Sequence, residues 1–317
     1  MTFPSDDPAE SAAPIPKPAD AKPVWGRATS PVQAECNSAD AGVDSNADFA
    51  LAASGPSDGP TVEFVPPAPR DPKWNDPVWT GWDVLRLIFL TVVALFIGVG
   101  AVLLVARWRF YPHTTFGDIA RVPLVVIAGQ SLAYLLVLGY MYVLVTRERG
   151  RPDFLAAVHW NWPVNVAVYV LAGFVLSVAL QAVAHLLPIP KELPIDNFFR
   201  TPAEAWALGI LSVALAPLME ELFFRGFLYP VLARRLGLPI AVFLTALAFA
   251  LLHGAQLGFS WGPVLVIFLV GMVLTVVRAY KNSVAACVLI HMAYNGTITV
   301  AMFAATDGFR HLEKLNQ

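Results

Sequence analysis

Charged residues and cysteines are both scarce in this sequence. Only 14% of its residues are charged, whereas soluble domains average roughly 25%. The two cysteines, Cys36 and Cys287, are far apart in the chain, and neither has metal-ligand spacing to another cysteine. There is also no basic stripe with interleaved aromatic side chains, as nucleic-acid binding would require. A disulfide scaffold and a nucleic-acid partner are therefore excluded.

Hydrophobic residues, by contrast, are abundant. They make up 57% of the chain, and the mean hydropathy is +0.60. A hydrocarbon layer of about 30 Å takes roughly 20 helical residues to cross. Apolar runs of about this length lie at 84–106, 122–145, 164–187, 203–236, 239–253, 262–279 and 283–304. The sequence therefore predicts an all-α polytopic membrane protein with about seven to eight transmembrane helices.

Residues 1–83 differ from the rest because they have no apolar period. They carry thirteen acidic and five basic residues, together with about half of the prolines. Such a segment cannot bury enough surface to offset the entropy of ordering. We therefore predict a disordered, acidic, proline-rich tail over 1–83 and a transmembrane domain over 84–310, with its polar motifs in 203–300.

The basic residues of the loops give the expected orientation. Nine lie on the side of the first helix that holds the N-terminus, and seven lie on the opposite side. The positive-inside rule then slightly favours a cytoplasmic N-terminus. The style of the sequence is bacterial, so we expect the cytoplasmic (inner) membrane.

Three charged residues interrupt the apolar stretch APLMEELFFRGFLYP, residues 216–230. An ionisable group inside a bilayer costs at least about 2.5–3.5 kcal/mol. Glu221 and Arg225 are four residues apart, with the acid first, and so are expected to form an ion pair. Glu220 points about 100° around the helix and is left over, either for a second ion pair or for a function. Pro217 suggests a kink or break nearby, where a cavity could open.

Further polar residues follow on the next helices, His253 in FALLH and His291 with Asn295 in HMAYN. Taken alone, each histidine is ordinarily a satisfied core residue. Counted from the neighbouring turns, however, Glu220 and His253 lie at a similar depth, roughly 25 Å in at 1.5 Å per residue. His291 and Asn295 lie somewhat shallower. We therefore expect these four side chains to meet in one site.

The chemistry expected of this set is hydrolysis by an activated water, because no serine or cysteine nucleophile accompanies it. Glu220 would take a proton from the water, and His253 would hold the water. His291 and Asn295 would stabilise the oxyanion. A bound zinc ion is the other route, with Glu220, His253 and His291 as its ligands, although the sequence contains no HExxH helix.

The three motifs EELFFR, FALLH and HMAYN occur in this order on successive apolar helices. They resemble the motifs of the CPBP intramembrane proteases, named for CAAX proteases and bacteriocin processing. FLVG, residues 268–271, resembles the weaker third motif of that family. The similarity covers roughly residues 203–300 and includes type II CAAX prenyl endopeptidases.

The resemblance implies an all-helical membrane endopeptidase that cuts a membrane-anchored protein or peptide, CAAX-like or otherwise. It implies Glu220 as the water-activating acid, Glu221 and Arg225 as its support, His253 as a water partner, and His291 with Asn295 as oxyanion stabilisers. The family is commonly labelled as metalloproteases, yet these residues also fit a metal-free glutamate mechanism. The alternatives are an ion-coupled carrier, with Glu220 and His253 relaying protons, and a non-catalytic scaffold or immunity factor.

Other polar residues in the apolar runs are given ordinary packing roles. Gln130, Gln181 and His185 are predicted to be interhelical hydrogen bonders. Tyr229 and Tyr294 are candidates to line the cavity.

Overall fold

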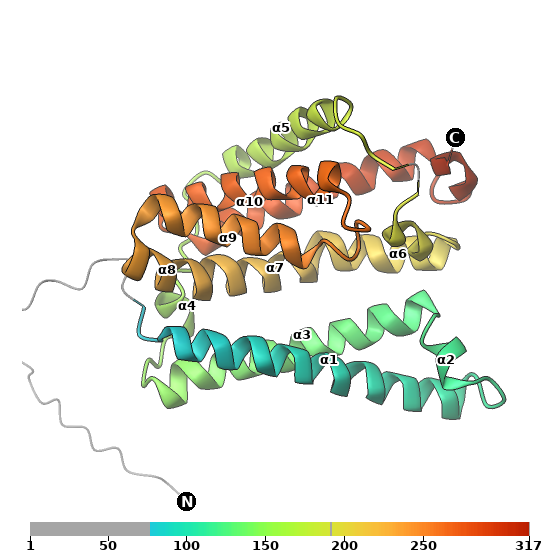
Figure 1. Ribbon diagram of the computed structural model, residues 1–317, viewed down its shortest axis with the longest axis horizontal. Coiled ribbons are helices and arrows are strands. Elements are labelled where there is room, and N and C mark those ends of the chain that lie inside the picture. Colours follow the sequence, from blue (N-terminus) through green and yellow to red (C-terminus); the bar gives the residue numbers. More distant parts are fainter. Residues whose placement is uncertain (1–76, 191, 317) are drawn as a thin grey trace, which may run out of the picture. The chain divides into compact units, whose positions relative to one another are not determined.

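The computed structural model describes residues 77–190 and 192–316. Its regular elements in this part of the chain are all helical (Figure 1). They are α1 Gly81–Arg109, α2 Phe116–Ile119, α3 Pro123–Val143, η1 Leu144–Glu148, α4 Phe154–Ala157, α5 Val166–Ala184, η2 Pro194–Phe198, α6 Pro202–Ile210, η3 Leu211–Leu215, α7 Ala216–Glu221, η4 Leu222–Leu228, α8 Tyr229–Leu236, α9 Leu238–Leu252, α10 Trp261–Lys281, α11 Val284–Ala305 and η5 Leu312–Asn316. The predicted all-α fold is confirmed.

Six of the helical stretches are long and apolar enough to cross a membrane. They are Gly81–Arg109, Pro123–Glu148, Val166–Ala184, Pro202–Leu236, Trp261–Lys281 and Val284–Ala305. The seventh expected span, α9, has only 15 residues. Each predicted apolar run thus corresponds to one helical stretch, and the protein is an integral membrane protein.

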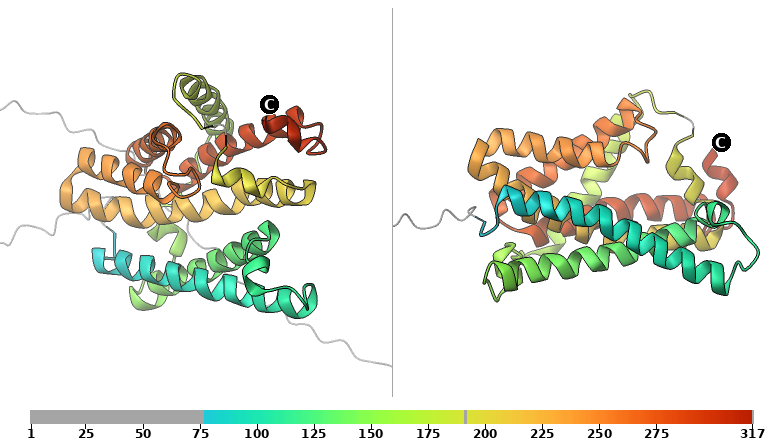
Figure 2. Two further views of the ribbon diagram at one scale, coloured as in Figure 1. Left: turned by 45° about the vertical axis from the view of Figure 1, so that its right-hand side comes forward. Right: turned by 60° about the horizontal axis from the view of Figure 1, so that its bottom comes forward.

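Helices α1 and α3 form a closely packed pair, as both views in Figure 2 show. Two glycines allow the backbones to meet. A Cβ atom at Gly98 would lie 2.6 Å from the carbonyl oxygen of Gly129, and a Cβ at Gly129 would lie 2.8 Å from Cα of Val99. Small residues at such contacts let membrane helices approach closely and gain dispersion energy. This pair leaves much of the apolar surface of α1 exposed.

Packed structure begins before the expected domain boundary at residue 84, because α1 starts at Gly81. Residues 1–76 of the predicted tail lie outside the described part, but Trp79 is buried, and its Nε1–H donates to the carbonyl oxygen of Phe227 at 3.1 Å. Its ring also stacks on the Phe227 ring at 4.5 Å between centroids. Asp83, placed in the tail by the sequence, caps α1 and pairs with Arg149. The start of α1 is therefore anchored to η4.

The stretch Pro202–Leu236 stays helical throughout, so the expected break at Pro217 is absent. Two π segments, η3 and η4, provide the irregularity instead. This stretch packs against α3, α9 and α11. Glu220 and Glu221 lie at the end of α7, between the two π segments, and so face helices from three other parts of the chain.

The remaining helices close the core around that stretch. Helix α5 packs on α11 so tightly that a Cβ at Gly173 would overlap the carbonyl oxygen of Ile290. Helix α9 packs on α10 at Gly271, where a Cβ would lie 3.1 Å from Cα of Ala246. These close contacts fix α9 and α11, which carry the two histidines.

Candidate active site

The expected ion pair between Glu221 and Arg225 is confirmed. Arg225 Nη1 donates to Glu221 Oε1 at 2.8 Å, and both side chains are fully buried. Arg225 Nη2 donates to the carbonyl oxygen of Gly271 at 3.0 Å. The FLVG glycine therefore has two roles, since its small size lets α9 approach α10 and its carbonyl oxygen accepts from the arginine.

Glu221 also binds a histidine of α11. Its Oε1 atom lies 2.8 Å from Nδ1 of His291. A carboxylate that is paired with Arg225 is an acceptor, so Nδ1 carries the hydrogen of this bond. Glu221 thus sets the ring orientation of His291 and, in the neutral form of the ring, leaves the lone pair on Nε2.

His253 is oriented in the same way by its own helix. It lies at the C-terminal end of α9, and its Nδ1 is 2.8 Å from the carbonyl oxygen of Phe249. A carbonyl oxygen can only accept, so Nδ1 again carries the hydrogen and Nε2 carries a lone pair in the neutral ring. The FALLH spacing therefore provides the group that orients the histidine, one turn before it.

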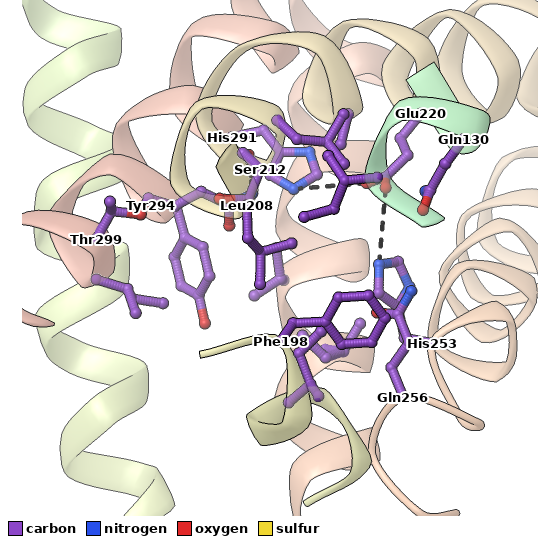
Figure 3. A pocket seen from close by; sticks show the side chains of 18 of the residues that line it. Gln130, Phe198, Leu208, Ser212, Glu220, His253, Gln256, His291, Tyr294 and Thr299 are labelled. Atoms are coloured by element: carbon purple, nitrogen blue, oxygen red, sulfur yellow. Dashed lines mark hydrogen bonds and ion pairs between the residues drawn. The ribbon is translucent and has the colours of Figure 1, made fainter. Parts of the chain in front are cut away.

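Glu220 faces both of these nitrogen atoms. Its Oε1 lies 3.8 Å from Nε2 of His253, and its Oε2 lies 3.8 Å from Nε2 of His291 (Figure 3). These distances are too long for hydrogen bonds, and in the neutral forms lone pairs would face lone pairs. A water molecule can donate to both members of such a pair at about 2.8 Å from each. The arrangement suits a bound water next to the carboxylate.

These side chains line a cavity of about 280 Å³. Glu220, His253, His291 and Asn295 all contribute to its wall, so the expected meeting of the four residues is found. The wall is otherwise mostly apolar, and Phe198 of η2 lies on it near His253 (Figure 3). A peptide group could therefore be held next to Glu220 in largely apolar surroundings.

Asn295 makes a contact that the sequence did not suggest. Its Nδ2 donates to the backbone carbonyl oxygen of Ser212 at 2.7 Å. An amide nitrogen has two hydrogens, so a second one is left for the cavity. Asn295 can thus fix the helix that carries Glu220 and still offer a donor to a ligand.

The other polar residues of the apolar runs agree with their expected positions only in part. Gln130, predicted to bond between helices, lines the cavity and donates from Nε2 to the hydroxyl of Tyr134 on its own helix at 2.9 Å. Tyr294 also lines the cavity, whereas Tyr229 is buried in an apolar cluster with α9 and α10. Gln181, on α5, and His185, directly after it, are exposed. Gln256, in the loop after α9, was missed because loop residues carry no periodic signal.

The expected zinc ligands can be compared with this geometry. Two imidazole nitrogens and a carboxylate are donor types that zinc prefers, and oriented Nδ1–H groups are common around such sites. Within residues 77–190 and 192–316, however, no group of three or more His, Cys, Asp or Glu side chains is placed so that it could hold a metal ion. The side chains as arranged do not fit an ion, and zinc binding stays a prediction.

A partly buried carboxylate that faces two oriented histidines, inside a bundle of membrane helices, is an arrangement typical of a hydrolytic site. Comparison with family models gives a match over part of the chain. Residues 202–297 match the model described as type II CAAX prenyl endopeptidase Rce1-like. The resemblance seen in the three motifs is therefore confirmed over this segment. No curated protein and no solved structure matches the chain.

Proposed function

We propose that this protein is a membrane-embedded endopeptidase that hydrolyses a peptide bond with a water activated by Glu220. The observation that supports it most strongly is the placement of the Glu220 carboxylate 3.8 Å from Nε2 of both His253 and His291. With both rings neutral, acceptor atoms of three side chains surround one small volume, and a water can donate to two of them at a time.

In the proposed reaction, the water donates its hydrogens to Glu220 and to Nε2 of a histidine. Glu220 takes one proton as the water oxygen attacks the scissile carbonyl carbon. The oxyanion that forms accepts from the second amide hydrogen of Asn295. Glu220 then returns the proton to the leaving amine as the C–N bond breaks. Glu221 and Arg225 act by holding His291 in the required tautomer. A stabilising role for His291 at the oxyanion needs a proton on Nε2.

The proposed substrate is a membrane-anchored protein or peptide of the CAAX type. A second hollow supports this choice. It has a volume of about 320 Å³, is lined almost entirely by apolar side chains, and has Glu220 at its border. It lies between α1, α3, η4 and α9, as Val92, Tyr134, Phe223 and Ala248 of its wall show. An apolar anchor in this hollow would place the adjoining peptide next to Glu220.

The test compares new protein termini in membranes that contain equal amounts of the wild type or of Glu220→Gln. We expect wild-type membranes to contain cut sites that Glu220→Gln membranes lack. Glu204→Gln is the matched control, because Glu204 lies on the same helical stretch at the N-terminal turn of α6 and outside the cavity. Its cut sites should equal those of the wild type.

Two further outcomes decide between mechanisms. Loss of the cut sites on addition of a chelator, with recovery on addition of zinc, would favour the metal route over the metal-free route. Identical termini in wild-type and Glu220→Gln membranes, with both proteins folded, would contradict the peptidase and favour a carrier or a scaffold.

A further inference from the structure

The helical stretch that carries Glu220 contains the same combination of a π segment and a proline twice. Each π segment is followed by a proline, η3 by Pro217 and η4 by Pro230. In a π turn, an N–H donates to the carbonyl five residues earlier. Ala216 N–H donates to Leu211 O, and Tyr229 N–H donates to Phe224 O. The next residue is a proline in both cases and has no N–H.

The missing N–H groups leave two backbone carbonyls without a helical donor. These belong to Ser212 and Arg225, each five residues before its proline. A buried carbonyl without a partner is costly. Both carbonyls receive a side-chain donor from another helix: Asn295 Nδ2 at 2.7 Å for Ser212, and Arg278 Nε at 3.0 Å for Arg225.

Arg278 makes these contacts from a fully buried position near the end of α10. Its Nη1 donates to Oδ1 of Asn282 at 2.7 Å, and its guanidinium lies 5.7 Å from the centre of the Tyr229 ring. Among the described residues, it forms no ion pair with an aspartate or glutamate. A buried cation without an acidic partner is unfavourable, so its hydrogen bonds must account for its place.

A continuous chain of contacts joins Arg278 to the reacting groups. The Arg225 whose carbonyl it binds donates through Nη1 to Glu221 Oε1. The same oxygen accepts from Nδ1 of His291. Nε2 of that ring faces Glu220. A displacement of the Arg225 backbone would therefore move Glu221 and turn His291 away from Glu220.

We propose that Arg278 is a positioning residue of the catalytic helix, acting through the Arg225 carbonyl that Pro230 leaves without a helical donor. The proposal rests on the proposed peptidase function. Asn295 secures the helix before Glu220, and Arg278 secures it after Arg225. The helix is thus held at two carbonyl groups on either side of Glu220. At each of them a proline removes the helical donor, and a side chain from a different helix donates instead.

The test is a double-variant experiment on the purified full-length chain, using the substrate found through its new termini. Arg278→Met removes the donors at similar side-chain length. We expect kcat to fall roughly 10- to 100-fold at nearly unchanged KM, because small displacements of catalytic groups cost about this much. Pro230→Ala supplies an N–H for the Arg225 carbonyl. In combination with Arg278→Met, it should restore at least roughly tenfold of the lost kcat.

Arg149→Met is the matched control. Arg149, directly after η1, pairs with Asp83 in the first turn of α1. Its loss should therefore reduce the amount of folded protein, leave kcat per folded molecule unchanged and show no response to Pro230→Ala. The pH profile of kcat gives a second readout. It should change shape in Arg278→Met and keep its shape in Arg149→Met, because only the former turns His291.

Unchanged kcat in folded Arg278→Met would overturn the proposal, and so would a lost kcat that Pro230→Ala does not restore. If Arg278→Met does not fold, Arg278→Leu, which also lacks a donor, takes its place under the same criteria. The wild type is measured in the same series. Absence of Glu220-dependent cleavage there counts against the peptidase itself, whereas cleavage that is insensitive to Arg278 counts against the positioning role alone.

Discussion

The α1–α3 pair and the stretch Pro202–Leu236, which carries Glu220, place their polar groups in opposite ways. Between residues 87 and 106, α1 has no charged residue, and its acids and bases lie at its ends. The stretch Pro202–Leu236 has Glu220, Glu221 and Arg225 near its middle, and the latter two are fully buried. One region is held by close backbone packing between glycines, the other by hydrogen bonds between charged groups. The difference shows that this protein buries charged side chains next to Glu220 and keeps them out of the middle of α1.

The largest expected effect comes from breaking the buried ion pair. Arg225→Met leaves Glu221 without its cationic partner and should lower the free energy of unfolding by about 3–5 kcal/mol. Arg86→Met, which removes a half-exposed partner of Glu148 near the start of α1, should lower it by about 0–1 kcal/mol. Unfolding in detergent measures both.

The double variant Glu221→Gln with Arg225→Met sharpens this prediction. Removing the negative charge as well should recover part of the loss, because no uncompensated carboxylate remains buried. A double variant as unstable as the sum of the single variants would show that the two side chains do not depend on each other.

The second effect tests the packing of the α1–α3 pair. Gly129→Ala places a Cβ 2.8 Å from Cα of Val99 and should cost about 1–3 kcal/mol of stability through overpacking. Gly139→Ala on the same helix meets open space and should be neutral or slightly stabilising. Cleavage per folded molecule should be unchanged in both. A loss of kcat in folded Gly129→Ala would show that this pair also shapes the site.

The third effect concerns the junction between the two regions. Trp79→Phe keeps an aromatic ring on Phe227 but removes the Nε1–H donor to its carbonyl oxygen. The expected loss is about 1 kcal/mol, the usual net value of such a bond. Thermal unfolding in detergent checks it. Trp108→Phe, at an exposed position near the end of α1, is the matched control and should change little.

The smallest effect is a dependence of stability on pH outside the membrane spans. Burial and the nearby Arg278 lower the pKa of His159 to about 4, below its ordinary value of about 6.5. The unfolded chain therefore binds the proton more readily, so the stability contribution is complete above pH 6.5 and is lost as pH falls towards 4. The ring is only partly buried, and solvent screening keeps the effect modest.

Unfolding measured from pH 7.5 to 4 should show this slope, and His159→Gln should reduce it. His113→Gln, the same substitution at an exposed histidine, is the matched control. A slope that persists in full in His159→Gln would assign the pH dependence to other groups.

Much of the site was predictable because its spacing is local. The four-residue interval between Glu221 and Arg225 fixes their pairing on any helix, and the same interval brings Phe249 O to His253. Gln130 and Arg278 were not predictable in their roles. Gln130 faces Glu220 only because of the rotation of α3, and Arg278 reaches the Arg225 carbonyl only because η4 is a π segment followed by Pro230.

The sequence by itself determined the membrane class, the helical spans and the residues of the three motifs, because hydrophobic length and helical periodicity act over neighbouring residues. The tertiary structure alone decided which carbonyls the prolines leave free, which side chains bind them, and that both Nε2 atoms face Glu220. Those features depend on the packing of helices from distant parts of the chain. Close contacts such as Gly173 against Ile290 and Gly271 against Ala246 set that packing.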